Sequence, residues 1–245
     1  MNKMKCEEPV IDVVNTRFSF DFPMSIIAAN IEEAQELLKS FLIIGFPDSF
    51  KRKARNFTKN LSIETGLDSV ERTQLYLAVA NITHINNPMA EVGVYKGGSA
   101  RIICEANSDK TLYLFDTFEG LPQLSEFDNP LLYYKGRFDT KIEEVVENLK
   151  ECKTEIIKGM FPESAKSFSD MKFSFVHLDV DLYQSTKDCL EFFYPKMSTG
   201  GIILSHDYQN NKGVNKAINE FFEDKPETIL WLLGSQCLIA RGKND

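Results

Sequence analysis

The chain has 245 residues, of which 43% are hydrophobic and 26% are charged, and its formal net charge is −8 with a pI near 5.1. The length suits one large α/β domain with an extension, or two small domains. The composition is near the average of globular proteins and argues against a chain that is disordered throughout. An acidic average also argues against a basic nucleic-acid-binding face, so we expect no nucleic-acid partner.

Residues 1–65 are predicted to form an extension before the first strand. Segment 18–22 alternates as an extended segment would, and apolar residues at helical spacing predict an amphipathic helix over 25–44. The apolar run 41–44 is too short to cross a bilayer, so we expect a cytoplasmic protein without membrane contact. The basic cluster 51–55 is interpreted as a solvated helix face. Because the amphipathic stripe must be buried somewhere, we expect this extension to act as a lid that shapes the acceptor pocket, or to contact a partner subunit in a homo-oligomer.

From residue 66 to residue 245 the chain is predicted to form one domain of alternating strands and helices. A capping box at Asp68 to Glu71 begins a helix that runs to about Asn81. Strands are expected near 89–94, 111–115, 154–158, 173–178, 201–205, 228–233 and 236–241, and helices near 98–107, 139–150, 162–169, 185–196 and 213–224. Only Gly234 and Ser235 separate the last two strands, so these should pair antiparallel. The order predicts a Rossmann-like α/β fold with a seven-stranded sheet and an antiparallel last strand.

A glycine turn follows the first strand of this sheet. Gly93 and Gly97 lie between that strand and a helix start at Ser99, and Asp116 follows the second strand. In such a unit the backbone approaches a ligand closely, and an acid about 20 residues on accepts hydrogen bonds from ribose hydroxyls. Tyr95 stands where a second glycine would meet a pyrophosphate, so the pattern favours S-adenosylmethionine over a dinucleotide. An ordinary strand-to-helix turn is the alternative.

Three later strand ends carry further candidates, because ligands gather at the carboxyl ends of parallel strands. Gly159 permits close approach of a ligand, and Met160 or Phe161 would cover an adenine or simply pack in the core.

Asp179 follows the fourth strand, and His206 and Asp207 follow the fifth. Neighbouring strands would bring these three side chains together, and such an O/N set suits Mg²⁺ or a similar divalent cation. The alternative is that Asp179 or Asp181 caps the helix expected near Ser185 and that His206 is a buried, hydrogen-bonded imidazole. For Asp181 we favour the capping role.

Four motifs in this order, ExGVxxGGS, FDTFEGLP, HLDVDLYQST and SHDY, closely resemble the macrocin O-methyltransferase family. The resemblance covers about residues 66–241 and implies a class I S-adenosylmethionine-dependent fold. It also implies a divalent metal, usually magnesium, and methyl transfer to a hydroxyl group, commonly on a sugar of a glycosylated natural product. The family more often has two acids before the tyrosine of the last motif, where this chain has His206, so the preferred metal stays open.

By motif position, the resemblance assigns the methionine end of the cofactor to Glu91 and Gly93, the ribose to Asp116, and the metal to Asp179 and Asp207. We therefore expect a cofactor site formed by Glu91, Gly93, Tyr95, Gly97, Ser99, Asp116, Thr117, Gly159, Met160, Phe161 and Asp179. The metal site is expected to consist of Asp179, His206 and Asp207.

The hydroxyl needs a base or a metal before it attacks the methyl group, and Asp179, His206 and His177 are the candidates for the base. His177 lies within a strand and is interpreted mainly as a buried imidazole. Two other functions stay open: a methyltransferase-fold binding or regulatory subunit without turnover, and a nicotinamide-dependent oxidoreductase.

Overall fold

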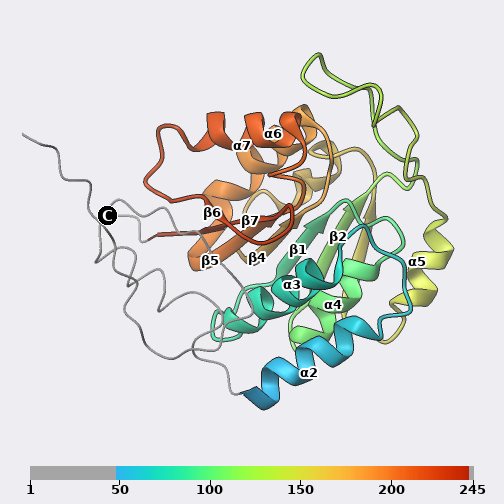
Figure 1. Ribbon diagram of the computed structural model, residues 1–245, viewed down its shortest axis with the longest axis vertical. Helices are drawn as coiled ribbons and strands as arrows, with labels where there is room; N and C mark the ends of the chain where they lie inside the picture. Colours follow the sequence, from blue (N-terminus) through green and yellow to red (C-terminus); the bar gives the residue numbers. More distant parts are fainter. Residues whose placement is uncertain (1–47, 243–245) are drawn as a thin grey trace, which may run out of the picture.

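The computed structural model describes residues 48–242, which form a central sheet with helices on both faces (Figure 1). The extended segment 18–22 and the helix expected over 25–44 lie outside the described residues, so both stay predictions. Among the helices of residues 48–242, none combines the length and apolar character that a membrane span requires.

The described chain begins with two helices, α2 (Asp48–Lys59) and α3 (Ser69–Asn81). The strands are β1 (Met89–Val92), β2 (Leu112–Asp116), β3 (Thr154–Lys158), β4 (Phe173–Leu178), β5 (Met197–Ser205), β6 (Leu230–Trp231) and β7 (Cys237–Ala240). The remaining helices are α4 (Gly98–Ala106), α5 (Ile142–Asn148), η1 (Glu163–Phe168), α6 (Tyr183–Phe193), η2 (Tyr194–Lys196) and α7 (Lys212–Phe222).

The strands form one sheet in the order β3-β2-β1-β4-β5-β7-β6. β1 lies at its centre and pairs in parallel with β2 and β4, so that Glu91 stands opposite Leu114 on one side and His177 on the other. β7 runs antiparallel to both β5 and β6. The predicted seven-stranded sheet with an antiparallel last strand is therefore confirmed. The strand order reverses between β1 and β4, and in open α/β sheets ligands bind at this point.

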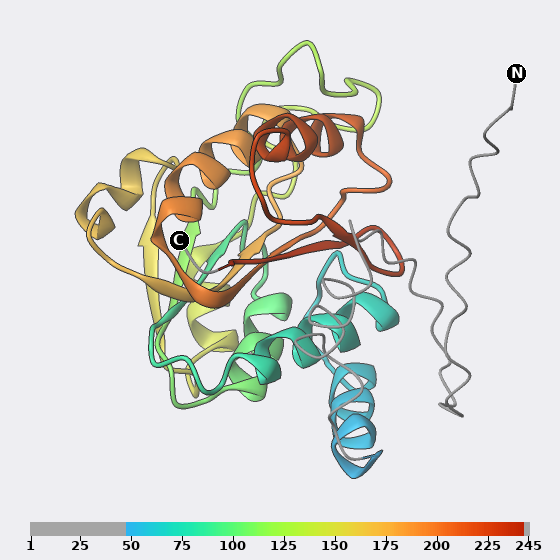
Figure 2. The same ribbon diagram turned by 90° about the vertical axis from the view of Figure 1, so that its left-hand side faces the viewer.

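Helices cover the two faces of the sheet in two groups, α2, α3 and α4 on one face and α6 and α7 on the other (Figures 1 and 2). Each strand contributes side chains to two hydrophobic cores, one on each face of the sheet, because successive side chains point to opposite faces. Leu114 belongs to the core under α3 and α4, whereas its neighbour Phe115 belongs to the core under α6 and α7. The strands buried on both faces read as nearly continuous apolar runs for this reason.

The start of α3 confirms the predicted capping box. The Asp68 carboxylate accepts hydrogen bonds from the backbone N–H groups of Val70 and Glu71, and the Glu71 side chain accepts one from the Asp68 N–H group. This exchange satisfies backbone donors that the first helical turn leaves unpaired.

Two element predictions are corrected in detail. The helix expected over 162–169 is a short 3₁₀ helix, η1, and the strand expected over 228–233 is reduced to the two residues of β6. The loop between β6 and β7 is longer than Gly234 and Ser235, because Leu232 N–H donates to the Gln236 carbonyl and Gly234 turns the chain with a φ of 76°. This loop reaches back towards α3.

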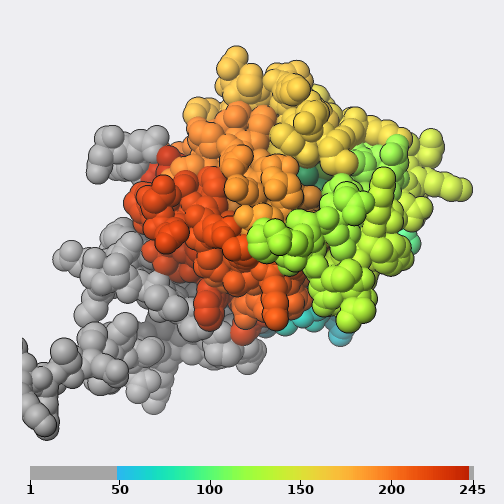
Figure 3. All heavy atoms as spheres, turned by 90° about the horizontal axis from the view of Figure 1, so that it is seen from above, coloured from blue at the N-terminus to red at the C-terminus, as the bar shows by residue number. Residues whose placement is uncertain are grey.

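A long segment between β2 and α5, residues 117–141, crosses the carboxyl end of the sheet, and it is green in Figures 1 and 3. Its base is closed by two backbone hydrogen bonds between Leu121 and the pair Gly136 and Arg137. Its middle is fixed to α6 and α7, where the Phe127 ring lies 4.6 Å from that of Tyr183. The segment is thus an ordered part of the wall above the sheet.

Candidate active site

A cavity of about 630 Å³ lies at the carboxyl ends of β1, β2, β4 and β5. Its size and place are those of a small-molecule site in an open α/β sheet. The sequence-predicted residues that line it are Gly93, Tyr95, Ser99, Asp116, Thr117, Gly159, Met160, Phe161, Asp179, His206 and Asp207.

The glycine turn after β1 forms the floor of the cavity. Gly93 has a φ of 83°, and a Cβ atom there would lie 1.9 Å from the Asp179 carbonyl oxygen, so only glycine lets the turn approach the end of β4. The Asp116 carboxylate accepts from the N–H groups of Val94 (2.7 Å), Tyr95 (3.1 Å) and Phe118 (2.8 Å). Since a carboxylate offers about four acceptor positions, Asp116 fixes the turn and keeps capacity for a ligand hydroxyl.

Two predicted cofactor contacts, Gly97 and Glu91, do not line the cavity. Gly97 is the N-cap of α4, and a Cβ atom there would meet the Leu149 side chain at 3.3 Å, so this glycine serves the packing of the turn. Glu91 is fully buried under the cavity floor, where its Oε1 lies 2.7 Å from His177 Nδ1. Burial raises the pKa of Glu91, and the hydrogen bond to His177 opposes that increase.

His177 is fully buried within β4, as its position in the strand predicted. Its Nδ1 is paired with Glu91, but its Nε2 has no partner in residues 48–242. This fully buried imidazole is not among the residues that line the cavity, which argues against its candidacy as the base.

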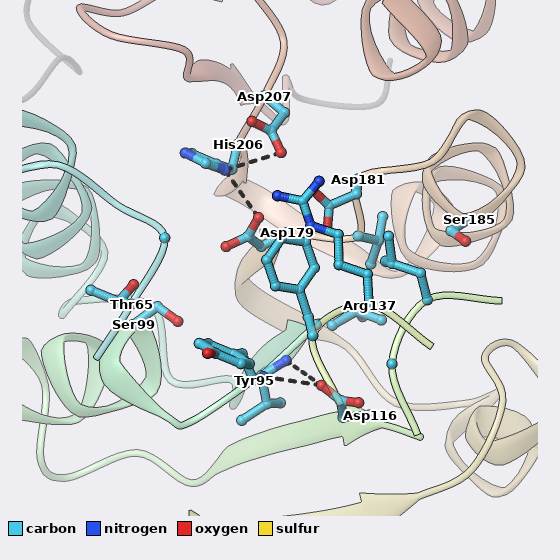
Figure 4. Close-up of a pocket in the computed structure, with 18 of the residues that line it drawn as sticks. Thr65, Tyr95, Ser99, Asp116, Arg137, Asp179, Asp181, Ser185, His206 and Asp207 are labelled. Carbon is cyan, nitrogen blue, oxygen red and sulfur yellow. Dashed lines mark hydrogen bonds and ion pairs between the residues drawn. The ribbon is translucent and has the colours of Figure 1, made fainter. Parts of the chain in front are cut away.

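Asp179, His206 and Asp207 converge at one side of the cavity (Figure 4). His206 Nδ1 lies 3.0 Å from Asp179 Oδ1 and 3.2 Å from Asp207 Oδ2, and the potential ligand atoms of all three lie within 4.8 Å of one another. Asp179 directly follows β4, His206 and Asp207 directly follow β5, and these two strands are hydrogen-bonded neighbours. Their adjacency brings together groups 27 residues apart in the sequence.

Glu71 of α3 contacts the opposite side of the same imidazole, a role that could not be predicted from the sequence. Its Oε2 lies 3.3 Å from His206 Nε2, while its Oε1 accepts from the N–H and hydroxyl groups of Ser235. Burial raises the pKa of Glu71, but the hydrogen bond to His206 and those from the backbone outweigh it and lower the pKa to about 2.

Three carboxylates thus surround His206. Burial by itself lowers the pKa of this imidazole, but the charge of Asp179 and the hydrogen bonds to Asp179, Asp207 and Glu71 raise it well above its usual value. The same attraction lowers the pKa of Asp179 although burial opposes it. The three carboxylates therefore stabilise a positive charge, either on the His206 imidazole or on a cation bound next to it.

Asp181 does not cap α6, so the capping role that we favoured is wrong. The N-cap of α6 is Leu182, which makes no side-chain cap hydrogen bond, and Asp128 from the 117–141 segment accepts from the Tyr183 N–H group instead. Asp181 has a φ of 57° and lines the cavity. Burial, followed by the charges of Asp179 and Asp207, raises its pKa well above the usual value.

Backbone strain concentrates at this cavity. In residues 48–242, five residues other than glycine have a positive φ, and four of them line the cavity: Tyr95, Phe138, Asp181 and Asp207. Such conformations persist only where the surroundings impose them, and they cluster at functional sites.

The remaining predicted contacts differ in exposure. Phe161 lines the cavity and also stacks on Phe193 at 5.4 Å, so it contacts both the cavity and the core. Met160 is 47% exposed at the edge, which excludes simple core packing for this side chain. Thr117 donates to the Gly120 carbonyl group, and Ser99 lies in the first turn of α4.

The donor set fits a divalent cation. Two ligands at right angles, each about 2.1 Å from a common ion, are about 3 Å apart, which is close to the separations at His206 Nδ1. Two carboxylates and one imidazole suit Mg²⁺, Mn²⁺ or a related ion. Glu71 resembles the outer carboxylate that commonly orients a metal-binding histidine.

Comparison with known proteins gives a consistent result. The family model described as macrocin-O-methyltransferase matches residues 64–228. The chain is 24% identical over 226 residues to a rhamnosyl-tetracenomycin-C 4'-O-methyltransferase of Streptomyces olivaceus, with coverage of 80% of this chain and 87% of that protein. It is 23% identical to a demethyldecarbamoylnovobiocin O-methyltransferase of Streptomyces niveus, with coverage of 72% and 73%. The solved structure of the O-methyltransferase NovP superposes with a TM-score of 0.64 at 22% identity, covering 73% of this chain and 82% of that one.

Proposed function

Because the chain belongs to the macrocin O-methyltransferase family, we propose that it methylates a hydroxyl group of a sugar or of a glycosylated small molecule, with help from a divalent cation. Family membership makes it an S-adenosylmethionine-dependent O-methyltransferase, which removes the oxidoreductase alternative. The name of one relative describes a rhamnosyl-tetracenomycin as the acceptor, and that of another describes demethyldecarbamoylnovobiocin. The rhamnosyl group of the first supports a glycosylated acceptor.

One observation carries the proposal. The acidic cluster of Asp179, His206 and Asp207 opens into the same cavity as Asp116 and the glycine turn. A cofactor lying along the turn would thus present its methyl group towards the cluster, where an acceptor hydroxyl would be held. Placing the two reactants in line is the main contribution that a protein makes to such a transfer.

We assign the cofactor contacts from the geometry of the cavity floor. Asp116 would accept from the ribose hydroxyls, and Gly159, Met160 and Phe161 would border the adenine. The first turn of α4, which has no side-chain cap, would face the methionine carboxylate with its unpaired N–H groups. Tyr95, Ser99 and Thr117 complete this side.

Asp179, His206 and Asp207 would hold the cation. When bound, such an ion lowers the pKa of a coordinated hydroxyl group and so makes it a better nucleophile. Glu71 keeps the imidazole oriented by accepting from Nε2, which leaves Nδ1 directed at Asp179 and Asp207.

For the catalytic base we retain Asp179 and His206. Each lines the cavity and offers an acceptor atom beside the place proposed for the hydroxyl group. When Nδ1 of His206 is engaged in holding the cation, Asp179 is the one of these two residues that keeps an uncommitted acceptor atom to receive the proton. Without a cation, the surrounding carboxylates would keep His206 protonated, so Asp179 would have to receive the proton in that case as well.

We also propose that residues 1–65 shape the acceptor side of the cavity and that 66–245 form the catalytic domain. The end of this extension supports a position beside the cavity, since Glu64 and Thr65 line it next to the start of α4 and Glu64 Oε1 accepts from the Tyr95 hydroxyl group at 3.1 Å. Removal of residues 1–47 is expected to change acceptor turnover or oligomeric state while leaving S-adenosylhomocysteine binding intact.

The proposal is tested by methyl transfer to a panel of hydroxylated glycosides, with EDTA and with added Mg²⁺, Mn²⁺, Co²⁺ or Ni²⁺. We expect EDTA to abolish transfer while S-adenosylhomocysteine still binds in calorimetry. Asp179→Asn and Asp207→Asn should lose most activity, and His206→Asp should retain it with a shift towards Mg²⁺. Full activity in EDTA would exclude the metal assignment, and binding without transfer to any acceptor would favour a binding or regulatory subunit.

A further inference from the structure

Arg137 is a cation in an otherwise acidic cavity. Within the described part of the chain, seven carboxylate side chains line the cavity, whereas Arg137 is the only arginine or lysine that does so. The acids are Glu64, Asp68, Glu71, Asp116, Asp179, Asp181 and Asp207. In this setting an arginine is expected to pair with one of them.

Arg137 pairs with none of these acids. In residues 48–242 its guanidinium group makes no ion pair and no hydrogen bond, and no dashed line reaches it in Figure 4. It lies instead 4.5 Å from the centre of the Phe138 ring and 5.5 Å from that of Tyr133. Aromatic rings support a guanidinium group without using its N–H donors, so its five donors stay available to a ligand.

The backbone holds this side chain in place. Leu121 N–H donates to the Arg137 carbonyl group at 2.8 Å, and Gly136 N–H donates to the Leu121 carbonyl group at 2.9 Å. A Cβ atom at Gly120 would lie 2.3 Å from the Gly136 carbonyl oxygen, so the two chain segments are in close contact. Phe138 in turn packs its ring edge-on against Tyr95 at 5.8 Å. Arg137 therefore lies where backbone hydrogen bonds and close packing hold the two ends of the 117–141 segment together.

Arg137 faces the acceptor side of the cavity. In Figure 4 Arg137 is drawn on the side of the cavity where Asp179 and Asp181 project, while Thr65 and Ser99 are drawn on the opposite side. Tyr133, whose ring centre lies 5.5 Å from the guanidinium group, also lines the cavity. Burial raises the pKa of Tyr133 to about 12, and the charges of Asp207 and Asp181 add to this increase. The methionine carboxylate proposed at α4 would thus lie away from this guanidinium group.

We propose that Arg137 binds an anionic group of the acceptor, a phosphate or a carboxylate close to the hydroxyl that is methylated. This inference rests on the proposed function and narrows its acceptor class to sugars that carry a negative charge. A planar guanidinium group forms paired hydrogen bonds with either anion. In an acidic cavity such an anion is otherwise repelled, so Arg137 would decide which acceptors bind.

The test compares matched probes with the same sugar ring. Methyl glycosides, sugar 1-phosphates and uronic acids of glucose, galactose and mannose are titrated into the full-length protein with saturating S-adenosylhomocysteine and Mg²⁺. We expect the wild type to bind at least one charged form roughly 10- to 100-fold more tightly than its methyl glycoside. Whether the phosphate or the carboxylate is preferred distinguishes the two sources of the anion.

Arg137→Gln should abolish this preference, and Arg137→Lys should retain part of it because lysine keeps the charge but loses the paired geometry. Lys135→Gln is the matched control: it removes the same charge from an exposed residue of the same segment that does not line the cavity, and it should keep the preference. Circular dichroism and S-adenosylhomocysteine affinity show whether each variant is folded.

Two results would overturn the inference. One is the absence of any preference for charged probes in the wild type, or a preference that Arg137→Gln leaves unchanged. The other is a fall in S-adenosylhomocysteine affinity in Arg137→Gln with the probe preference intact, which would assign Arg137 to the cofactor carboxylate. Failure of the proposed function would give a different result: the protein would bind the probes but transfer no methyl group to them.

Discussion

Replacing Glu71 by glutamine is expected to weaken the hydrogen bonds of its side chain to three parts of the structure. The buried carboxylate accepts from the Asp68 N–H group in the capping box, from Ser235 in the β6–β7 loop and from His206 Nε2. Hydrogen bonds to a charged group contribute about 1.5–3 kcal/mol each, and a glutamine amide retains one acceptor oxygen for only part of this set. We therefore expect Glu71→Gln to lower the free energy of unfolding by about 2–4 kcal/mol.

The matched control is Asp68→Ala. This change removes the other half of the capping box without touching Ser235 or His206, and loss of a helix cap costs about 1 kcal/mol. Urea denaturation followed by circular dichroism measures both variants. If Glu71→Gln costs no more than Asp68→Ala, then Glu71 serves only the helix cap, and its tie to His206 is energetically unimportant.

The pH dependence gives this prediction a second test. The pKa of Glu71 in the folded protein is about 2, below its ordinary value of 4.5, so its charge stabilises the fold fully above about pH 4.5. That contribution is lost as the pH falls from 4.5 towards 2. The stability difference between wild type and Glu71→Gln should therefore shrink on acidification, and a constant difference would contradict the reasoning.

Further predictions concern the cavity floor and a cysteine. Gly93→Ala is expected to lower the free energy of unfolding by at least about 2 kcal/mol in urea denaturation, because the new Cβ atom meets the Asp179 carbonyl group at a positive φ. Asp116→Asn should weaken S-adenosylhomocysteine binding roughly 10-fold in calorimetry, and unchanged affinity would remove Asp116 from the site. A hydrogen bond from Cys104 and the charge of Arg101 lower the pKa of Cys152 to about 7, so its alkylation by iodoacetamide, followed by mass spectrometry, should be half-maximal near that pH and faster than that of Cys104.

The fold was predictable because its signals are local. Apolar runs separated by turn residues identified all seven strands, and the capping box fixed the start of α3. The sheet class followed from alternation of strands and helices together with the short connection between the last two strands. The predicted strand boundaries were wrong where tertiary contacts determine them. An example is β6, which is only two residues long because the chain turns into the β6–β7 loop.

The site residues were predictable only where a functional side chain comes directly after a strand. Asp179, His206 and Asp207 come immediately after β4 or β5, so strand adjacency alone brought them together. Glu71 could not be found in this way, because it lies on a helix 135 residues before the imidazole it contacts, and its capping role already accounted for it. Asp181 was misassigned for a related reason: a cap depends on where a helix starts, and α6 starts at Tyr183.

The balance of charge in the cavity links these parts. Seven carboxylates face a space in which His206 and Arg137 are the basic residues among those described. Such a cavity favours ligands that bring positive charge, and the sulfonium and ammonium groups of S-adenosylmethionine and a divalent cation all do so. Methyl transfer removes the sulfonium charge, so the same carboxylates attract the product less strongly than the substrate and favour its release. An anionic acceptor is repelled by these carboxylates. Among the described residues that line the cavity, Arg137 is the cationic side chain whose N–H donors remain available to bind such an acceptor.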